Sequence, residues 1–315
     1  MNRKPLLLLI VLFISFSTLQ AQDSTELIKQ LEKQATPAKT YVTSTFKSTR
    51  LINGHTTETT PPGTMDLRIS HRFGLLNSGF YNFFGLDEAH MRLGFDFGIT
   101  KSLMVGIGHN THIGTYDGFF KLKLLRQSKG VSAMPVSVTL LSGIAMNARK
   151  KIDLEAIMYA PPVVYKVQSF SDRVSFVYQL LIARKFSESF ALQLMPTLIH
   201  HDNIHLNDVQ ALSVYKEINA LAIGAGGRYR ISKRTHLTAE YYYQLPSTQT
   251  PGTTNSLSFG VDIETGGHVF QLHVTNSRHM LEQSFITEST GQWDKGDILF
   301  GFNILRVFHI HHKKA

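Results

Sequence analysis

The chain has 315 residues, no cysteine and a formal charge of +9. The missing cysteine excludes disulfides, thiolate nucleophiles, cysteine-ligated zinc and amino-terminal lipoprotein anchoring. An excess of basic residues can indicate nucleic-acid binding, but no dense run of Lys and Arg occurs, so we expect no nucleic-acid partner.

Residues 1–21 have the pattern of a signal peptide. Arg3 and Lys4 give a positive start, Leu6 to Phe16 form an apolar core, and Ala21 offers a small residue for cleavage. The apolar core is too short to cross a bilayer as a helix, and no later run of about eighteen apolar residues occurs. We therefore expect an exported chain whose membrane insertion, if any, uses strands.

Residues 22–63 are predicted to precede the main fold. Asp23 to Gln34 reads as a short amphipathic helix with capping-box spacing at its start. Two interpretations of this helix stay open: a plug docked in the periplasm or lumen, or a poorly ordered terminal helix. Tyr41 to Ile52 looks strand-like, and a polar loop follows to Gly63. We expect Tyr41 to Ile52 to lie outside the main sheet, inside a lumen or paired locally.

Residues 64–308 alternate apolar and polar side chains with a period of two, the pattern of strands with one apolar face. The clearest hairpin is Leu257 to Asn276, in which Thr265-Gly266-Gly267 supplies the positive φ of a tight turn. About twelve such segments follow from Thr64: 65–70, 91–99, 103–108, 120–124, 136–140, 174–182, 190–198, 221–231, 237–243, 257–264, 270–275 and 298–304.

Predicted short turns (100–102, 127–134, 187–189, 232–234, 265–267) alternate with longer connections (74–90, 147–172, 201–217, 245–254, 277–296). This alternation is typical of transmembrane barrels with periplasmic turns and outer loops, and an even strand number brings both ends to the periplasm. We therefore predict an all-β fold, a transmembrane antiparallel up-and-down β-barrel of about twelve strands with a short N-terminal helix, followed by a tail at 309–315. Pro196 falls within a predicted strand, where a bulge would accommodate it. The competing architecture is a soluble β-sandwich or a periplasmic barrel. Strand length, loop alternation and aromatic residues near strand ends argue against it.

The mature chain resembles a family of uncharacterised outer-membrane β-barrel proteins of Gram-negative bacteria, a domain of unknown function. The resemblance is carried by TFKSTRLINGH (Thr45 to His55), LRISHRFG (Leu67 to Gly74), YDGFFKLKLLRQ (Tyr116 to Gln127), GAGGRYR (Gly224 to Arg230), ETGGHVFQLHVTNS (Glu264 to Ser277) and FGFNILRVF (Phe300 to Phe308). It implies a barrel in the cell outer membrane of a Gram-negative bacterium, and it supplies no catalytic residue.

The candidate site residues are the charged and polar side chains on the face of each strand opposite the apolar one. A charge in hydrocarbon costs a few kcal/mol, so these side chains must face the inside of the barrel or its rims. The basic candidates are Arg68, Arg72, Arg92, Lys121, Lys123, Arg228 and Arg230, and the acidic and polar ones are Asp66, Asp96, Glu240, Asp262, Gln271 and His273. Two interpretations remain open: a mildly basic lumen that passes or binds a small anionic solute, and a salt-bridged interior that fills the barrel. Inward glycines either leave room for water, a solute, a loop or Tyr41 to Ile52, or relieve strain in the curved wall.

Three further possibilities are set aside. His200, His201 and His205 fall in a predicted outer loop with spacing that matches no metal site, so we predict no metal. Ser277 and His273 are close in sequence, but no G-x-S-x-G motif occurs, so a lipid-hydrolysing enzyme is not predicted. No feature requires a cofactor. The leading hypothesis is a small-solute channel or lumen-binding barrel, with outer-membrane lipid and lipopolysaccharide as partners; the alternative is a non-conducting anchoring barrel.

Overall fold

The computed structural model describes residues 38–112, 114–148, 170–205 and 214–310. The predicted signal peptide, the predicted helix at Asp23 to Gln34 and the tail from residue 311 lie outside these ranges. The chain divides into two units, residues 1–40 with 129–133, and residues 41–128 with 134–315. Two short strands, β1 (Thr40–Tyr41) and β6 (Ser128–Lys129), form a separate small sheet. Everything that follows concerns the second unit.

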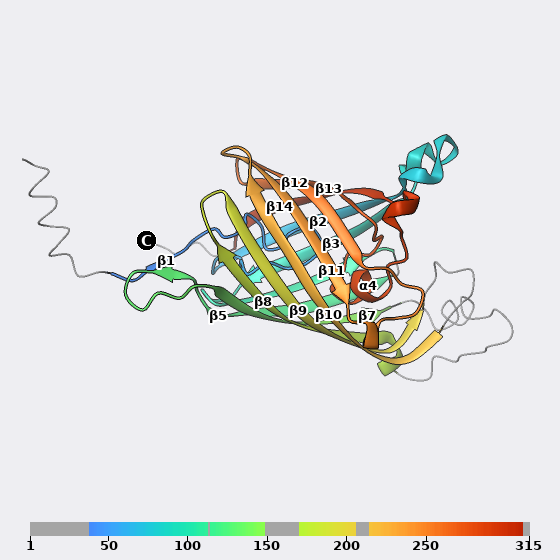
Figure 1. The fold of residues 1–315 in the computed structure, drawn as a ribbon, viewed down its shortest axis with the longest axis horizontal. Helices are drawn as coiled ribbons and strands as arrows, with labels where there is room; N and C mark the ends of the chain where they lie inside the picture. Colours follow the sequence, from blue (N-terminus) through green and yellow to red (C-terminus); the bar gives the residue numbers. More distant parts are fainter. Residues whose placement is uncertain (1–37, 113, 149–169, 206–213, 311–315) are drawn as a thin grey trace, which may run out of the picture. The chain divides into compact units, whose positions relative to one another are not determined.

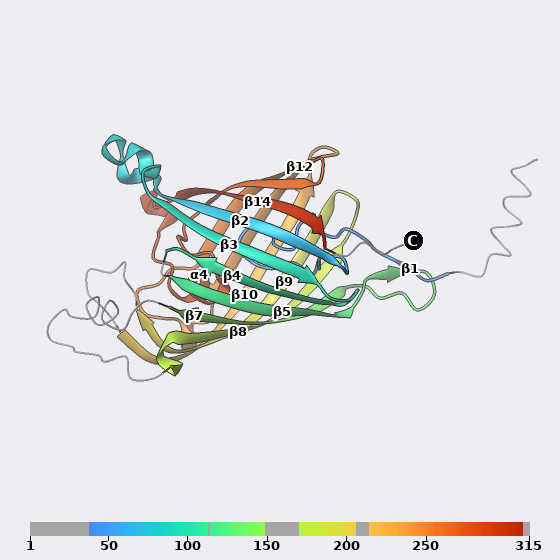
Figure 2. The same cartoon turned by 180° about the vertical axis from the view of Figure 1, so that it is seen from behind.

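The second unit contains a closed antiparallel barrel (Figures 1 and 2). Consecutive wall strands pair with each other, and β14 pairs with β2 to close the ring. The predicted twelve-stranded all-β barrel is confirmed within the described residues. Its strands are β2 (Thr64–Leu75), β3 (Ala89–Gly98), β4 (Leu103–Asn110), β5 (Thr115–Leu125), β7 (Ser137–Asn147), β8 (Val174–Lys185), β9 (Phe190–His205), β10 (Val214–Arg230), β11 (Thr235–Gln244), β12 (Ser256–Thr265), β13 (His268–Thr275) and β14 (Leu299–His309).

Burial alternates along the wall because successive strand side chains point to opposite faces. In β2 the even-numbered residues from Thr64 to Gly74 are buried, and the odd-numbered ones from Met65 to Leu75 are partly exposed. The buried set includes Asp66, Arg68 and Arg72, so the polar face is the interior of the barrel. Large apolar side chains such as Leu194 and Ile223 point outward and are exposed, as a lipid-facing wall requires.

The alternation of short and long connections is close to the prediction but not strict. The links 99–102, 186–189, 231–234 and 266–267 are short, and 76–88, 148–173, 245–255 and 276–298 are long. The link 111–114 joins β4 to β5 at the long-loop end, yet it has only four residues. Of the strand-like stretch Tyr41 to Ile52, only Tyr41 lies in a strand, as the second residue of β1. Residues 45–49 form bends, and Arg50 forms an isolated antiparallel bridge with His55.

Two local predictions were wrong. The register is continuous around Pro196, since the pairs Gln179↔Thr197 and Ile182↔Leu194 keep one alignment, so no bulge occurs. Two β8–β9 pairs are instead missing at that point, which removes the need for the absent N–H of proline. His200, His201 and His205 lie in β9 and not in a loop, because β9 and β10 extend further outward than predicted.

The helices of the described ranges are short and occur between strands. They are η2 (Leu76–Ser78), η3 (Phe80–Gly85), η4 (Ser171–Arg173), η5 (Pro246–Thr248), α4 (Glu282–Thr287) and η6 (Trp293–Lys295). None of the helices in the described ranges is both long and apolar enough to cross a bilayer.

Candidate functional site: a sealed lumen

The predicted site residues lie on the inner face of the barrel. Most are almost fully buried: Arg68, Arg72, Arg92, Lys121, Arg228, Asp66, Asp96, Glu240, Asp262, Gln271 and His273. Lys123 and Arg230, near the short-turn end, are partly exposed. Burial this deep is unexpected for the wall of an open aqueous channel, so another part of the chain must cover these side chains.

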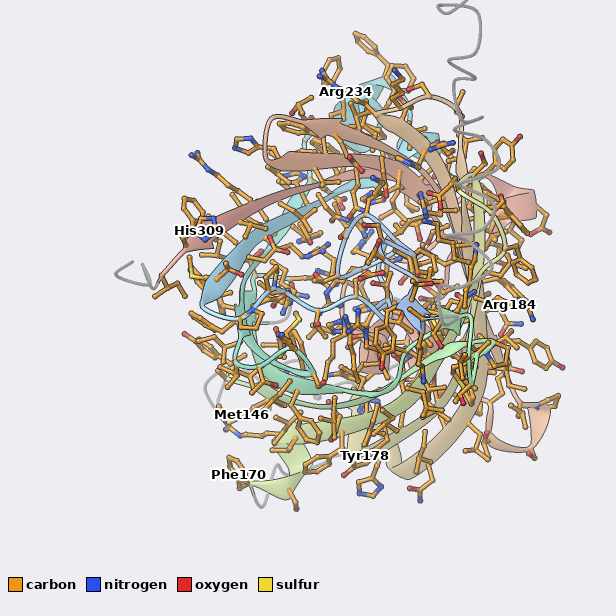
Figure 3. All side chains as sticks on the ribbon, turned by 90° about the vertical axis from the view of Figure 1, so that its left-hand side faces the viewer. Met146, Phe170, Tyr178, Arg184, Arg234 and His309 are labelled. Atoms are coloured by element: carbon orange, nitrogen blue, oxygen red, sulfur yellow. The ribbon has the colours of Figure 1, made fainter. Side chains whose placement is uncertain are left out.

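Residues 45–60, which we call the lumenal segment, provide that cover. All of them are buried except Lys47, Glu58 and Thr59, which are half-buried. Viewed along the barrel, this pale-blue stretch runs inside the ring of strands and side chains crowd the space around it (Figure 3). The lumen is therefore occupied by the chain itself.

Basic wall residues donate hydrogen bonds to the lumenal segment. Arg68 donates to the hydroxyls of Ser48 at 2.8 Å and Thr49 at 3.2 Å. Lys121 Nζ donates to the carbonyl oxygens of Thr49, at 3.2 Å, and Glu58. Arg228 donates to the carbonyls of Thr45 and Ser44, and Arg72 donates to Asn53 Oδ1. These cations thus bind backbone and side-chain oxygens of the same chain.

Glu240 on β11 holds the middle of the segment. Its carboxylate accepts backbone N–H groups from Ile52 at 3.2 Å, Asn53 at 2.8 Å and Gly54 at 3.1 Å. A carboxylate that accepts several backbone donors is among the stronger hydrogen-bonding arrangements in proteins. Removing it would leave buried N–H groups without an acceptor.

Wall amides satisfy much of the remaining segment backbone. Gln271 donates to Leu51 O at 2.8 Å and Asn303 donates to Ile52 O at 3.0 Å. Gln193 accepts from Thr57 N–H at 2.9 Å and donates to His55 O at 2.7 Å. The segment needs these partners because it has no strand ladder of its own, and buried backbone groups must be paired.

Inward glycines make room for the segment. A Cβ on Gly98 would overlap the carbonyl oxygens of Thr60 and Pro61, and one on Gly226 would overlap the side chain of Leu51. At these two positions the space left by glycine is filled by residues from the N-terminal side of the barrel. The alternative explanation, that glycine relieves strain in the curved wall, is not needed at these two positions.

A second stretch, residues 277–291, folds inward at the long-loop end; we call it the outer plug. It contains α4, all six residues of which are buried. Phe285 packs against Tyr242 with ring centroids 4.9 Å apart. Phe285 and Ile286 join an apolar cluster on the inner wall that also contains Leu141, Val177, Leu181, Met195, Ile199, Ala220, Ala222 and Tyr242. Apolar contacts of Phe285 and Ile286 thus help to hold the outer plug.

The lumenal segment and the outer plug meet at a buried ion pair. Arg50 Nη1 lies 3.2 Å from Glu282 Oε1, and the two side chains are 3% and 4% exposed. The same carboxylate accepts the His55 backbone N–H at 3.3 Å, and Arg50 also donates to Asn53 O at 2.9 Å. A cavity at this junction, lined in part by Phe119, has a volume of about 10 Å³. That is room for about one water molecule.

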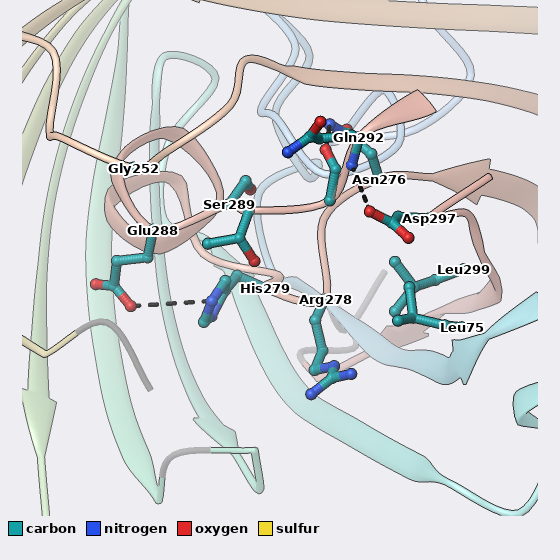
Figure 4. A pocket seen from close by; sticks show the side chains of 12 residues that line it. Leu75, Gly252, Asn276, Arg278, His279, Glu288, Ser289, Gln292, Asp297 and Leu299 are labelled. Atoms are coloured by element: carbon teal, nitrogen blue, oxygen red, sulfur yellow. Dashed lines mark hydrogen bonds and ion pairs between the residues drawn. The ribbon is translucent and has the colours of Figure 1, made fainter. Parts of the chain in front are cut away.

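Larger cavities lie on either side of the junction. One of about 520 Å³ is lined by residues of the outer plug and neighbouring loops, among them Arg278, His279 and Glu288 (Figure 4). One of about 110 Å³ is lined by Thr43, Glu58 and others near the short turns. Burial, Arg278 and His90 lower the pKa of His279 to about 4. His279 is therefore neutral at pH 7, and its 4.0 Å contact with Glu288 is not an ion pair there.

Ser277 and His273 make no hydrogen bond with each other among the described residues. Ser277 Oγ instead accepts a hydrogen bond from Ser289 Oγ at 2.6 Å. In the described part of the chain, no group of three or more His, Asp and Glu side chains is placed to hold a metal ion.

Several site residues were missed from the sequence. Arg50, Glu282, Asp117 and the inward apolar cluster were not predicted. Asp117 pairs with Arg92, and its Oδ1 accepts from Arg92 Nε at 3.0 Å. Asp117 could have been predicted, since it lies four residues before Lys121 in the same strand and therefore on the same face. Arg50 and Glu282 had none, because they are 232 residues apart and both lie outside strands.

A closed barrel with an apolar outer wall and a polar, covered lumen defines a membrane β-barrel protein. The family model described as "Membrane bound beta barrel domain (DUF5777)" matches residues 46–308, and the chain belongs to this family. That match begins within the lumenal segment, so the segment is part of the family's domain along with the strands.

Comparison with solved structures finds similar barrels at low identity. A NanC porin is 7% identical over 77% of this chain and 98% of its own, with a TM-score of 0.47. The KdgM porin is 9% identical over 78% and 99%, with a TM-score of 0.42. LpxR from Salmonella typhimurium is 9% identical over 78% and 99%, with a TM-score of 0.32. Comparison with curated protein sequences finds no match.

Proposed function

We propose that this protein is a barrel of the Gram-negative cell outer membrane that is closed at rest and passes a small solute when its lumenal segment moves. The observation that carries this proposal is the meeting of the two inward segments at the buried pair of Arg50 and Glu282, beside a cavity of about 10 Å³. A cavity of that size has room for about one water molecule. We therefore infer that a solute passes only when one of the two segments moves.

The lumenal segment is the proposed gate. Its backbone donates hydrogen bonds to Glu240 and accepts them from Lys121, Arg228 and Gln271, and its hydroxyls accept from Arg68. Phe46 and Leu51 also pack against Ala183 and Ala191 of the wall. Water can replace hydrogen bonds of this kind at a modest net cost, because each is worth only about 0.5–1.5 kcal/mol net, or about 1.5–3 with a charged group. In the outer plug, Phe285 and Ile286 belong to a larger apolar cluster, and water does not replace contacts of that kind.

The charge of the segment suggests how to move it in an experiment. It has two cations, Lys47 and Arg50, and one anion, Glu58, so its net charge is one positive with His55 neutral. Moving one elementary charge across the full membrane changes its energy by about 2.3 kcal/mol per 100 mV. Voltage that is negative on the short-turn side should therefore draw the segment out of the lumen.

Planar-bilayer conductance of the mature protein tests the proposal. We expect silence at low voltage, openings at one polarity, and steady conductance from a variant that lacks residues 45–60. Lys47→Gln, which makes the segment neutral, should weaken the dependence on polarity. A silent deletion variant that is folded and inserted would refute the gate.

The second candidate is a permanently closed anchoring barrel. It is favoured by the apolar packing of the outer plug, in which Phe285 and Ile286 are buried. Its signature is a wild-type protein that never opens at either polarity, although the variant lacking 45–60 conducts. Such a barrel would act through its loops or its N-terminal residues.

The surroundings of the barrel are also part of the proposal. We place the short turns and both chain ends in the periplasm, and we assign residues 1–21 to a signal peptide. Outer-membrane lipid and lipopolysaccharide are the proposed neighbours. A small anionic solute is the proposed cargo, because the covered wall carries more cations than anions among the predicted site residues. We propose no enzymatic activity.

A further inference from the structure

The connection between β2 and β3 exposes aromatic side chains at the long-loop end of the barrel. Residues 76–86, LNSGFYNFFGL, form the two short helices η2 and η3 and project beyond the strand ends (Figures 1 and 2). Tyr81 is 94% exposed and Phe80 is 82% exposed, and Phe83 and Phe84 are about half exposed. We call this stretch the aromatic lobe. Exposed apolar groups this close together normally mark a contact surface.

The lobe has an ordered base. Leu76 N–H donates to Ile298 O at 2.8 Å, and Asn77 donates to Asp297 Oδ1 at 2.8 Å. Its tip has an unusual backbone, because Phe83 (φ 45°) and Phe84 (φ 54°) both adopt the left-handed conformation. Bulky residues rarely adopt it, since the Cβ approaches the neighbouring carbonyl. Phe84 N–H donates to Gly79 O at 2.8 Å and closes the turn that presents the rings.

The lobe continues the lipid-facing surface of the wall without a break. The outward residues of β2 run from Met65 to Leu75, and all are apolar except His71, which stacks on Phe302 at 4.9 Å. Ten residue steps at about 3.3 Å and a tilt near 40° span a height of about 25 Å, the usual height of the apolar band. The band therefore ends at Leu75, and the lobe begins at the next residue.

The lobe also lacks charged side chains, which would oppose contact with lipid most strongly. Residues 76–86 contain no Asp, Glu, Lys or Arg. The first acidic side chains follow at Asp87 and Glu88, and Glu88 lies 3.6 Å from Arg278 on the neighbouring loop. Aromatic side chains are enriched where hydrocarbon meets headgroups, and no charge would have to be desolvated here.

We propose that the aromatic lobe inserts into the outer leaflet of the membrane and anchors the β2–β3 side of the barrel there. Phe80, Tyr81 and Phe84 lie among the headgroups and the first part of the acyl chains, roughly 5–10 Å deep. The occupant of this surface is lipid, because the surface begins where the lipid-facing band of β2 ends. The inference depends on membrane insertion of the barrel and does not depend on the proposed gate.

Tryptophan fluorescence in brominated lipid tests this proposal. The chain has a single tryptophan, Trp293, whose ring packs on Phe259 with centroids 5.8 Å apart. Trp293→Phe keeps an aromatic ring there and gives a background without tryptophan. Phe80→Trp then reports on the lobe, and Ser247→Trp, an exposed position in η5 of another outer loop, is the matched control.

The variants are placed in phosphatidylcholine vesicles, either unlabelled or brominated near the headgroup end of the acyl chain. We expect roughly threefold quenching of Phe80→Trp by the bromine and little change for Ser247→Trp, as interfacial insertion requires. Unchanged Phe80→Trp emission in an inserted barrel would overturn the proposal. Blue-shifted emission that appears only at high protein density would also overturn it, because a second copy would then cover the lobe.

Discussion

At the scale of single residues, the buried pair of Arg50 and Glu282 matters most. An ion pair removed from water pays a desolvation cost that its mutual attraction only partly offsets, so the pair need not stabilise the fold. Losing one partner is different, because the other charge is then left buried without compensation. The pair therefore favours the one arrangement in which the two segments meet, because either charge alone would be buried without a partner.

A double-variant cycle checks this role. Arg50→Met and Glu282→Met should each lower the free energy of unfolding by about 3–5 kcal/mol. The double variant should be close to the wild type, since it buries no unpaired charge. Urea unfolding of the barrel in detergent micelles gives the three values. Simple additivity of the two single effects would contradict the pairing.

His279 makes the outer plug sensitive to acid. Its pKa is about 4 in the folded protein and about 6.5 in an unfolded chain, so the unfolded state binds a proton first as pH falls. The stability associated with neutral His279 is complete above pH 6.5 and is lost progressively toward pH 4. The loss should reach about 3 kcal/mol, and urea unfolding across this range measures it. His279→Gln should flatten that part of the profile; an unchanged profile would assign it to other groups.

The sequence could predict which residues point inward but not what they bind. Strand parity placed Arg68, Lys121 and Glu240 in the lumen, because a period of two leaves no alternative once one face is lipid. Their partners come from the lumenal segment, which has no periodic pattern. Contacts such as Asn303 with Ile52 join residues 251 positions apart, and no local rule of the chain encodes them.

At the scale of elements, the outer plug differs most from expectation. Residues 277–296 were predicted as an outer loop, and their first part instead enters the barrel as α4. Six residues are too few for helical periodicity to stand out. The inward apolar cluster was missed for a related reason: Leu181, Met195 and Ile199 have the parity of polar lumen residues, and the interior was taken to be polar throughout.

Shortening one side chain tests how the outer plug is held. Phe285 is fully buried against Tyr242, so Phe285→Ala should cost about 3–5 kcal/mol of unfolding free energy. Phe186, which is more than half exposed in a short turn, is the matched control, and Phe186→Ala should cost under about 1 kcal/mol. Equal costs would mean that α4 does not pack as described.

At the scale of the whole molecule, the barrel wall and the lumenal segment depend on each other, because each supplies hydrogen-bond partners for the other. Twelve strands form a ring wide enough to hold extended chain, and the sequence gives this ring both a polar inner face and a segment that covers it. The strand number was predictable from parity and from the even count that a barrel requires. Whether the ring was open or filled was not, because the same inward charges suit water, solute or chain.

Ion selectivity without the lumenal segment reports on the exposed wall. In a variant lacking residues 45–60, Arg68 and Lys121 lose their oxygen partners in the segment and Arg228 loses the carbonyl of Thr45, so these cations are uncovered. We expect anion preference in reversal-potential measurements under a salt gradient. Arg68→Gln with Arg228→Gln should reduce that preference at least about twofold. Unaltered selectivity in a conducting double variant would remove these residues from the conduction path.

The pairing of β14 with β2 has a consequence for the order of assembly. The first and last strands meet, so the ring cannot close until residues 299–309 are in place. The lumenal segment precedes β2 in the chain, yet Ile52 contacts Asn303 on the last strand. Contacts between residues so far apart in sequence form slowly, because the chain loses loop entropy before the contacts stabilise it. The simplest route is that the strands assemble around the lumenal segment. In the last step β14 then pairs with β2 and also contacts the enclosed segment.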